Sequence, residues 1–175
     1  GLTFKVVPAD IPDFQIKLDA LESMLSENTA AIILNSPNNP SGVVYTAETL
    51  TRLAQVLTKK SQELGRPIYL ISDEPYREIA FGGCVVPWLP SFYDNTIVTY
   101  SFSKSLSLPG ERIGYVAVSS TMADRQDIFD AVCGAARGYG YVNAPSLMQR
   151  VIEKCLGATA DMEKYRANRD KLYKG

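Results

Sequence analysis

Short apolar runs alternate along this chain with stretches in which apolar residues recur at helical spacing. Runs of this length, rich in Val, Ile and Tyr, are typical of strands. We predict five of them, at residues 2–9, 30–37, 67–74, 95–102 and 112–119. The apolar residues of the second run do not alternate with polar ones, so we expect that strand to be buried on both faces. The fifth run follows the fourth too closely for a crossover helix, which predicts an antiparallel pairing between them.

Helical periodicity fills the intervals between the strands. Residues 19–25 predict a short helix, in which Asp19 and Glu22 have the spacing of a capping box. A longer amphipathic helix is predicted between Thr46, placed as its N-cap, and Gly65, placed to end it. Each helix therefore connects two of the predicted strands.

From about residue 121 the pattern is helical, with a Gly/Asn/Pro break in "RGYGYVNAPS" at 137–146 and a charged stretch at 160–175. Strands that alternate with helices indicate an α/β fold in which helices cover a central sheet. We therefore expect a three-layer αβα arrangement whose sheet is mostly parallel and contains one antiparallel strand.

Three of the predicted strands end in clusters of polar residues. These ends are "NSPNNPSG" at 35–42, "SDEPY" at 72–76 and "SFSKS" at 101–105. In open α/β sheets, ligands bind beyond the carboxyl ends of the strands. The three segments therefore predict one shared ligand site.

Composition excludes several classes of function. A formal net charge of −1 gives no electrostatic reason to expect nucleic acid or an anionic membrane as a partner. The absence of histidine removes Ser-His-Asp and Cys-His nucleophiles and histidine-based zinc sites. Three isolated cysteines suit a reducing, cytoplasmic compartment and predict neither a disulfide framework nor a metal site.

Lys104 is the strongest candidate for catalysis among the residues at the strand ends. Serines flank it, and Arg112 follows eight positions later, a combination suited to binding phosphate. With Asp73 and Tyr76 at the end of the preceding strand, a lysine beside a phosphate site suggests Schiff-base chemistry. Taken one at a time, these residues have simpler explanations: a helix cap for the aspartate, a solvated lysine and a surface ion pair for the arginine.

The string "NSPNNPSG … SDEPYREIAF … SFSKSLSLPGERIGY" resembles the fold-type I, class I/II aminotransferases that use pyridoxal 5'-phosphate. The resemblance extends over nearly the whole chain. It implies that Lys104 forms a Schiff base with the cofactor and then moves the substrate proton. It also implies that Asp73 faces the pyridine nitrogen and that Tyr76 and Asn39 donate to the phenolic oxygen of the ring. The implied phosphate ligands are Ser101, Arg112 and, as a weaker candidate, Ser103.

Members of this family are typically more than twice as long as 175 residues. The resemblance therefore implies an incomplete large domain at 1–156, followed at 157–175 by the start of a helix leading to a small domain. On this view the fragment alone binds the cofactor weakly or not at all and is inactive, whereas its parent binds the cofactor and is a homodimer. The break at 137–146 resembles the family segment near the partner's active site, which makes Tyr141 and Asn143 possible contributors, although a plain linker explains them equally well.

The function implied is transfer of an amino group between an amino acid and a 2-oxo acid, as part of a biosynthetic process. Two alternatives remain open. The first is a carbon–sulfur β-lyase, decarboxylase or aminocyclopropane-carboxylate-synthase-like enzyme on the same scaffold. The second is an aminotransferase-like effector domain of a transcription regulator. A nucleotide-binding domain is poorly supported, because the chain has neither a Walker-type loop nor a Gly-x-Gly-x-x-Gly turn.

Overall fold

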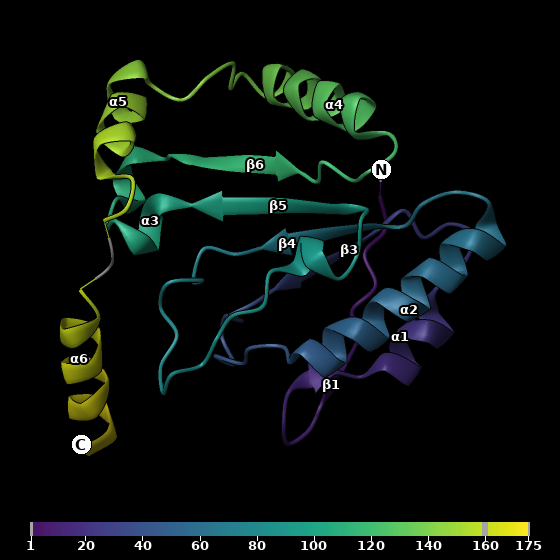
Figure 1. The fold of residues 1–175 in the computed structure, drawn as a ribbon, viewed down its shortest axis with the longest axis horizontal. Coiled ribbons are helices and arrows are strands. Elements are labelled where there is room, and N and C mark those ends of the chain that lie inside the picture. Colours follow the sequence, from purple (N-terminus) through teal and green to yellow (C-terminus); the bar gives the residue numbers. More distant parts are fainter. Residues whose placement is uncertain (1, 159–160, 175) are drawn as a thin grey trace.

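A four-stranded mixed sheet forms the centre of the computed structural model, which describes residues 2–158 and 161–174. The strands lie side by side in chain order (Figure 1): β3 (Ala31–Asn35), β4 (Tyr69–Asp73), β5 (Thr96–Ser101) and β6 (Gly114–Val118). The pairs β3–β4 and β4–β5 are parallel, and β6 is antiparallel to β5. The predicted α/β fold, with a mostly parallel sheet and one antiparallel strand, is confirmed.

Helices α1 (Leu18–Met24) and α2 (Ala47–Leu64) cover one face of this sheet (Figure 1). The predicted limits of α2 are confirmed. The Thr46 hydroxyl accepts a hydrogen bond from the Thr49 amide at 3.1 Å, and Gly65 ends the helix with a left-handed φ of 64°. The buried side of α2 and the facing strand residues form the main core, made of Leu34, Leu50, Leu53, Leu57, Ile68 and Leu70 with their neighbours.

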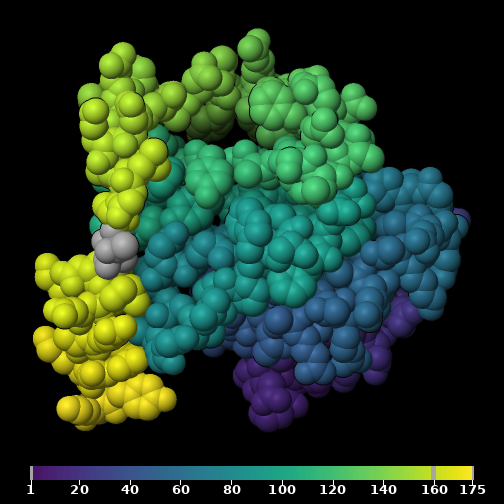
Figure 2. Space-filling view, in the orientation of Figure 1, coloured from purple at the N-terminus to yellow at the C-terminus, as the bar shows by residue number. Residues whose placement is uncertain are grey.

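Three further helices follow the sheet: α4 (Arg125–Gly138), α5 (Ser146–Cys155) and α6 (Met162–Lys174). Helix α4 lies beside β6 (Figure 1). Helix α6 (yellow) lies at the rim of the molecule, next to segments from the middle of the sequence (teal, Figures 1 and 2). Tyr69 alternates with the core residue Leu70, so it lies on the face opposite α2, where its hydroxyl donates to Asp124 just before α4. The predicted break between α4 and α5 is confirmed, whereas residues 160 and 175 of the predicted last helix lie outside the described residues. No helix in the described ranges is long and apolar enough to cross a membrane.

The predicted strand at 2–9 is wrong. Only Ala9–Asp10 (β1) forms a ladder, with Gln15–Ile16 (β2), and within the described chain residues 2–8 join no sheet. The alternating apolar side chains of this segment point into solvent, with Phe4 79% and Val6 86% exposed. An extended segment makes no internal hydrogen bonds, so the pattern alone does not produce a strand without a neighbouring edge to pair with.

Two finer predictions are also wrong. Helix α1 begins at Leu18 with Lys17 as its N-cap, so Asp19 lies within the first turn instead of capping it. Strand β3 is not buried on both faces, because Leu34 faces the core while Ile33 is 59% exposed on the other side. Helices α1 and α2 cover only one face of β3, which accounts for this difference.

The turn after β5 brings two backbones unusually close together. Helix α3 (Phe102–Ser105) follows β5 directly, and the 3-10 turn η2 (Pro109–Glu111) leads into β6; a second 3-10 turn, η1 (Leu89–Ser91), precedes β5. A Cβ at Gly114 would lie 2.2 Å from the Tyr100 carbonyl oxygen, so only glycine fits the start of β6. This close approach fixes the segment that carries Lys104.

Candidate active site

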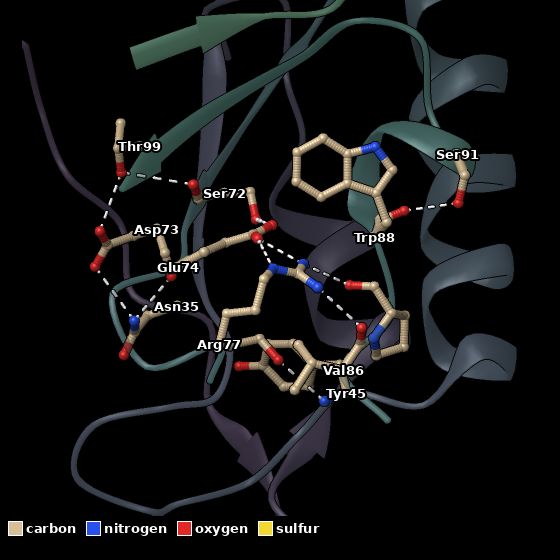
Figure 3. A network of polar contacts seen from close by, with 12 residues as sticks. Asn35, Tyr45, Ser72, Asp73, Glu74, Arg77, Val86, Trp88, Ser91 and Thr99 are labelled. Carbon is tan, nitrogen blue, oxygen red and sulfur yellow. Dashed lines mark hydrogen bonds and ion pairs between the residues drawn. The ribbon is translucent and has the colours of Figure 1, made fainter. Parts of the chain in front are cut away.

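A row of three polar residues crosses the carboxyl ends of β3, β4 and β5. Asn35 pairs in register with Asp73, and Asp73 with Thr99, so their side chains share one face of the sheet. The Thr99 hydroxyl donates to Asp73 Oδ1 at 3.0 Å, and Asn35 Nδ2 donates to Asp73 Oδ2 at 3.2 Å (Figure 3). Both oxygens of this half-buried carboxylate are therefore held in place, and each keeps a lone pair for a ligand.

The loop after β3 is tied to this row by the same asparagine. Asn35 Oδ1 accepts a hydrogen bond from the Asn39 amide at 2.7 Å, and Asn39 Nδ2 donates to the Tyr76 hydroxyl at 3.1 Å. Asn38 holds the far side of the loop, accepting from the Ser41 amide at 3.2 Å and the Ser41 hydroxyl at 2.7 Å. We call Asn35, Asn39, Asp73, Tyr76 and Thr99 the carboxylate cluster.

A buried ion pair supports the turn that carries Tyr76. Glu74 is 1% exposed; its Oε2 accepts from Arg77 Nε and forms an ion pair with Arg77 Nη2, while its Oε1 accepts from the Ser72 hydroxyl at 2.6 Å (Figure 3). Arg77 also donates to the carbonyl oxygens of Val86 and Pro87 at 3.0 and 2.9 Å. Sequence reasoning missed this pair, although an acid and a base three positions apart on either side of "PY" are a visible signal.

Lys104 lies on α3 and approaches the cluster from the next strand. Its Nζ is 5.9 Å from the centre of the Tyr76 ring, and its side chain is exposed. The Tyr165 hydroxyl on α6 donates to the Lys104 carbonyl oxygen at 3.4 Å, which brings the last helix to the same corner of the molecule. The structure therefore brings four predicted residues together, namely Asn39, Asp73, Tyr76 and Lys104.

The three predicted phosphate ligands make only local contacts. The Ser101 hydroxyl donates to the Ser103 hydroxyl at 2.7 Å, beside Lys104. Arg112 is exposed, adopts a left-handed φ of 51°, and donates to the Pro109 carbonyl oxygen at 2.8 Å. We call Ser101, Ser103 and Arg112 the hydroxyl segment.

The segment at 137–146 is largely exposed and connects α4 to α5. Tyr141 is 74% exposed, and Asn143 is exposed beside it, in the connection between α4 and α5. A role for either residue in a partner's site stays a prediction.

The side chains of the carboxylate cluster, Lys104 and the hydroxyl segment together suit one kind of ligand. A carboxylate binds a protonated ring nitrogen, and an amide and a phenol hydroxyl side by side donate to an anionic oxygen. A nearby lysine amine attacks a carbonyl carbon, and serine hydroxyls with an arginine bind phosphate. The arrangement fits a phosphorylated, aromatic aldehyde.

Comparison with known proteins gives a consistent result. The family model described as "Aminotransferase class I and II" matches residues 1–174. An aspartate aminotransferase from Bacillus subtilis is 35% identical over 127 residues, a match that covers 70% of this chain and 29% of that protein. The chain therefore spans under a third of the length of this curated relative.

Solved structures resemble the fold over more of the chain. An aminotransferase from Eubacterium rectale superposes with a TM-score of 0.92 at 57% identity, covering 96% of this chain and 42% of that one. N-Succinyldiaminopimelate aminotransferase from Mycobacterium tuberculosis superposes with a TM-score of 0.78 at 26% identity, covering 95% of this chain and 42% of that one.

Proposed function

Because this chain belongs to the class I and II aminotransferase family, we propose that its protein transfers an amino group between an amino acid and a 2-oxo acid, using pyridoxal 5'-phosphate. The observation that carries the proposal is the convergence of Asp73, Tyr76 and Lys104 at the strand ends, with the Lys104 amine 5.9 Å from the Tyr76 ring. The cofactor supplies an aldehyde that bonds to amines and a ring that withdraws electrons from the bond next to that nitrogen.

Lys104, three residues of the carboxylate cluster and the hydroxyl segment each have a defined part in this proposal. Lys104 would hold the cofactor through its amine and, as a free amine, would move a proton of the substrate. The negative charge of Asp73 would favour a proton on the ring nitrogen. Tyr76 and Asn39 would donate to the phenolic oxygen and stabilise it as an anion. The hydroxyl segment would bind the phosphate group.

The wider organisation follows as part of the same proposal. Residues 1–156 belong to a cofactor-binding large domain, and 157–175 begin the connection to a small domain. A homodimer is supported by the exposed apolar side chains around α4 and α5, among them Phe129 (54%), Val142 (59%) and Leu147 (70%). A cytoplasmic location is supported by the free cysteines Cys84 and Cys133, which are both exposed.

Transamination is favoured over the alternatives because the relatives described above are all named aminotransferases. A β-lyase or decarboxylase would share Asp73, Lys104 and Arg112, so the carboxylate cluster does not separate them. The reaction products separate the two classes. A β-lyase releases ammonia from a cysteine-type substrate without a 2-oxo acid, whereas a transaminase requires the oxo acid and releases no ammonia.

The proposal is tested by trapping the cofactor. The purified full-length parent protein is incubated with pyridoxal 5'-phosphate, reduced with sodium borohydride, digested and mapped by mass spectrometry. We expect the label on Lys104 and its loss in Lys104→Ala. A label spread over exposed lysines, or no label, would overturn the proposal. Lys171→Ala on α6 serves as the matched control and is expected to keep the label on Lys104.

A further inference from the structure

Asn35 makes side-chain contacts that its place at the end of β3 does not require. Its Nδ2 donates to both the carbonyl oxygen and the Oδ2 of Asp73, at 3.0 and 3.2 Å, across to the neighbouring strand. Its Oδ1 accepts from the Asn39 amide at 2.7 Å. One side chain therefore contacts two residues to which the proposed function gives separate parts.

The contacts continue beyond Asn39 to the tyrosine. Asn39 Nδ2 donates to the Tyr76 hydroxyl at 3.1 Å, so a chain of hydrogen bonds runs from Asp73 through Asn35 and Asn39 to Tyr76. Asp73 and Tyr76 are also joined through the backbone of the turn between them. The hydrogen-bond chain closes this into a ring, which fixes the distance between the carboxylate and the two donors.

The side chain at position 35 must donate to Asp73 and accept from Asn39, and a primary amide does both. An amide group donates through its nitrogen and accepts through its oxygen, whereas an ionised carboxylate of the same shape only accepts. Asn38, in the loop that follows β3, accepts from Ser41 and donates to the Asn35 carbonyl oxygen at 3.3 Å, so its contacts stay within that loop and the end of β3. The two asparagines thus differ in whether they reach β4.

We propose that Asn35 is a positioning residue that couples Asp73 to the Asn39–Tyr76 pair. It holds the group facing the ring nitrogen and the donors facing the phenolic oxygen at a fixed spacing before the cofactor arrives. The inference rests on the proposed function for the identity of the ligand. The coupling itself is a property of the chain and is measured without the ligand.

The test separates the two halves of the amide in three variants. Asn35→Ala removes both halves, Asn35→Asp keeps the acceptor for Asn39 but loses the donor to Asp73, and Asn38→Ala is the matched control in the loop. Two quantities are measured on each folded protein. The first is hydrogen exchange of the Asn39 backbone amide by NMR, and the second is the dissociation constant for pyridoxal 5'-phosphate by absorbance titration.

We expect Asn35→Ala to speed Asn39 exchange and to raise the dissociation constant, each by about tenfold, as for the loss of one or two net hydrogen bonds. In Asn35→Asp, exchange is expected to stay within about threefold of wild type while the dissociation constant rises about tenfold. Asn38→Ala is expected to change both by less than about threefold. Should Asn35→Ala fail to fold, Asn35→Asp decides alone.

A role limited to holding the loop gives a different pattern. Affinity would then follow exchange, so Asn35→Asp would bind the cofactor like wild type, and this result would overturn the inference. If the full-length wild-type protein binds no cofactor, the proposed function fails instead. In that case the hydrogen exchange of the Asn39 backbone amide still tests the coupling. Equal exchange rates in Asn35→Ala and Asn38→Ala would contradict the coupling, and a faster rate in Asn35→Ala alone would support it.

Discussion

The carboxylate cluster and the hydroxyl segment lie at the same edge of the sheet but are held in different ways. All but one of the side-chain hydrogen bonds named in the cluster join residues far apart in the chain: Asn35 to Asp73, Asp73 to Thr99 and Asn39 to Tyr76. Those of the hydroxyl segment join Ser101 to Ser103 and Arg112 to Pro109, only two and three positions apart.

The difference in hydrogen bonding determines whether each region is already arranged to bind a ligand. Long-range contacts exist only while the sheet is formed, so the fold itself arranges the cluster. Local contacts are easily exchanged, and an exposed arginine bound to one carbonyl oxygen is free to turn its remaining donors to a phosphate. We infer that the cluster is preorganised and that the hydroxyl segment rearranges on binding.

The largest expected effect is the loss of the ion pair beneath the cluster. Arg77→Ala leaves the buried Glu74 carboxylate without its partner and releases the loop at Val86. We expect the free energy of unfolding in urea to fall by about 3–5 kcal/mol. Lys59→Ala, which removes an exposed ion pair with Glu22, should cost less than about 1 kcal/mol. Equal effects of the two variants would show that the pair does not support the cluster.

A smaller effect is expected where β6 meets β5. Gly114→Ala places a Cβ 2.2 Å from the Tyr100 carbonyl oxygen, so the strands must separate next to the hydroxyl segment. We expect the free energy of unfolding to fall by about 1–3 kcal/mol. The matched control is Gly110→Ala, whose Cβ would meet nothing within 4 Å. A stability like that of wild type in Gly114→Ala would contradict the close approach.

Pyridoxal, which lacks the phosphate group, separates the contribution of the hydroxyl segment from that of the carboxylate cluster. Arg112→Ala should lower the affinity for pyridoxal 5'-phosphate by about tenfold, through the loss of charged hydrogen bonds, and leave the affinity for pyridoxal unchanged. Asn35→Ala should lower both affinities by the same factor. Parallel losses of the two affinities in Arg112→Ala would remove the distinction between the two regions.

The smallest effect is expected at the opposite end of β4. Burial and the hydrogen bond to Asp124 raise the pKa of Tyr69 to about 12 from the usual 10.0. Between these values the unfolded chain loses the phenol proton and the folded chain keeps it, so stability falls as pH rises from 10 toward 12. Tyr69→Phe should flatten part of this slope in urea titrations at each pH. An unchanged slope would contradict the raised pKa, and the cofactor affinity measured at pH 8 should stay as in wild type.

Sequence reasoning succeeded where the signal is local. The Thr46 side chain begins α2 and the left-handed backbone of Gly65 ends it, as their own chemistry predicts. The apolar runs of β4 and β5 end in the polar residues that meet at the site, also as predicted. It failed where the outcome depends on a neighbour. Residues 2–8 have a strand pattern but pair with no strand in the described chain, and Ile33 is exposed because one face of β3 is uncovered.

The site shows the same division. Asp73 and Lys104 were recognisable from their places at strand ends, whereas the contact of Asn35 with Asp73 depends on strand register, which the sequence does not specify. Glu74 and Arg77 carry a visible spacing, but their burial follows from the loop that packs over them.

A crystal structure of the protein with pyridoxal 5'-phosphate tests the central claim most directly. We predict that Asn35, Asp73 and Tyr76 keep their side-chain positions to within about 1 Å, as in preorganised sites. Arg112 should leave the Pro109 carbonyl oxygen and contact the phosphate. A structure in which the carboxylate cluster rearranges, while Arg112 stays on Pro109, would contradict the account.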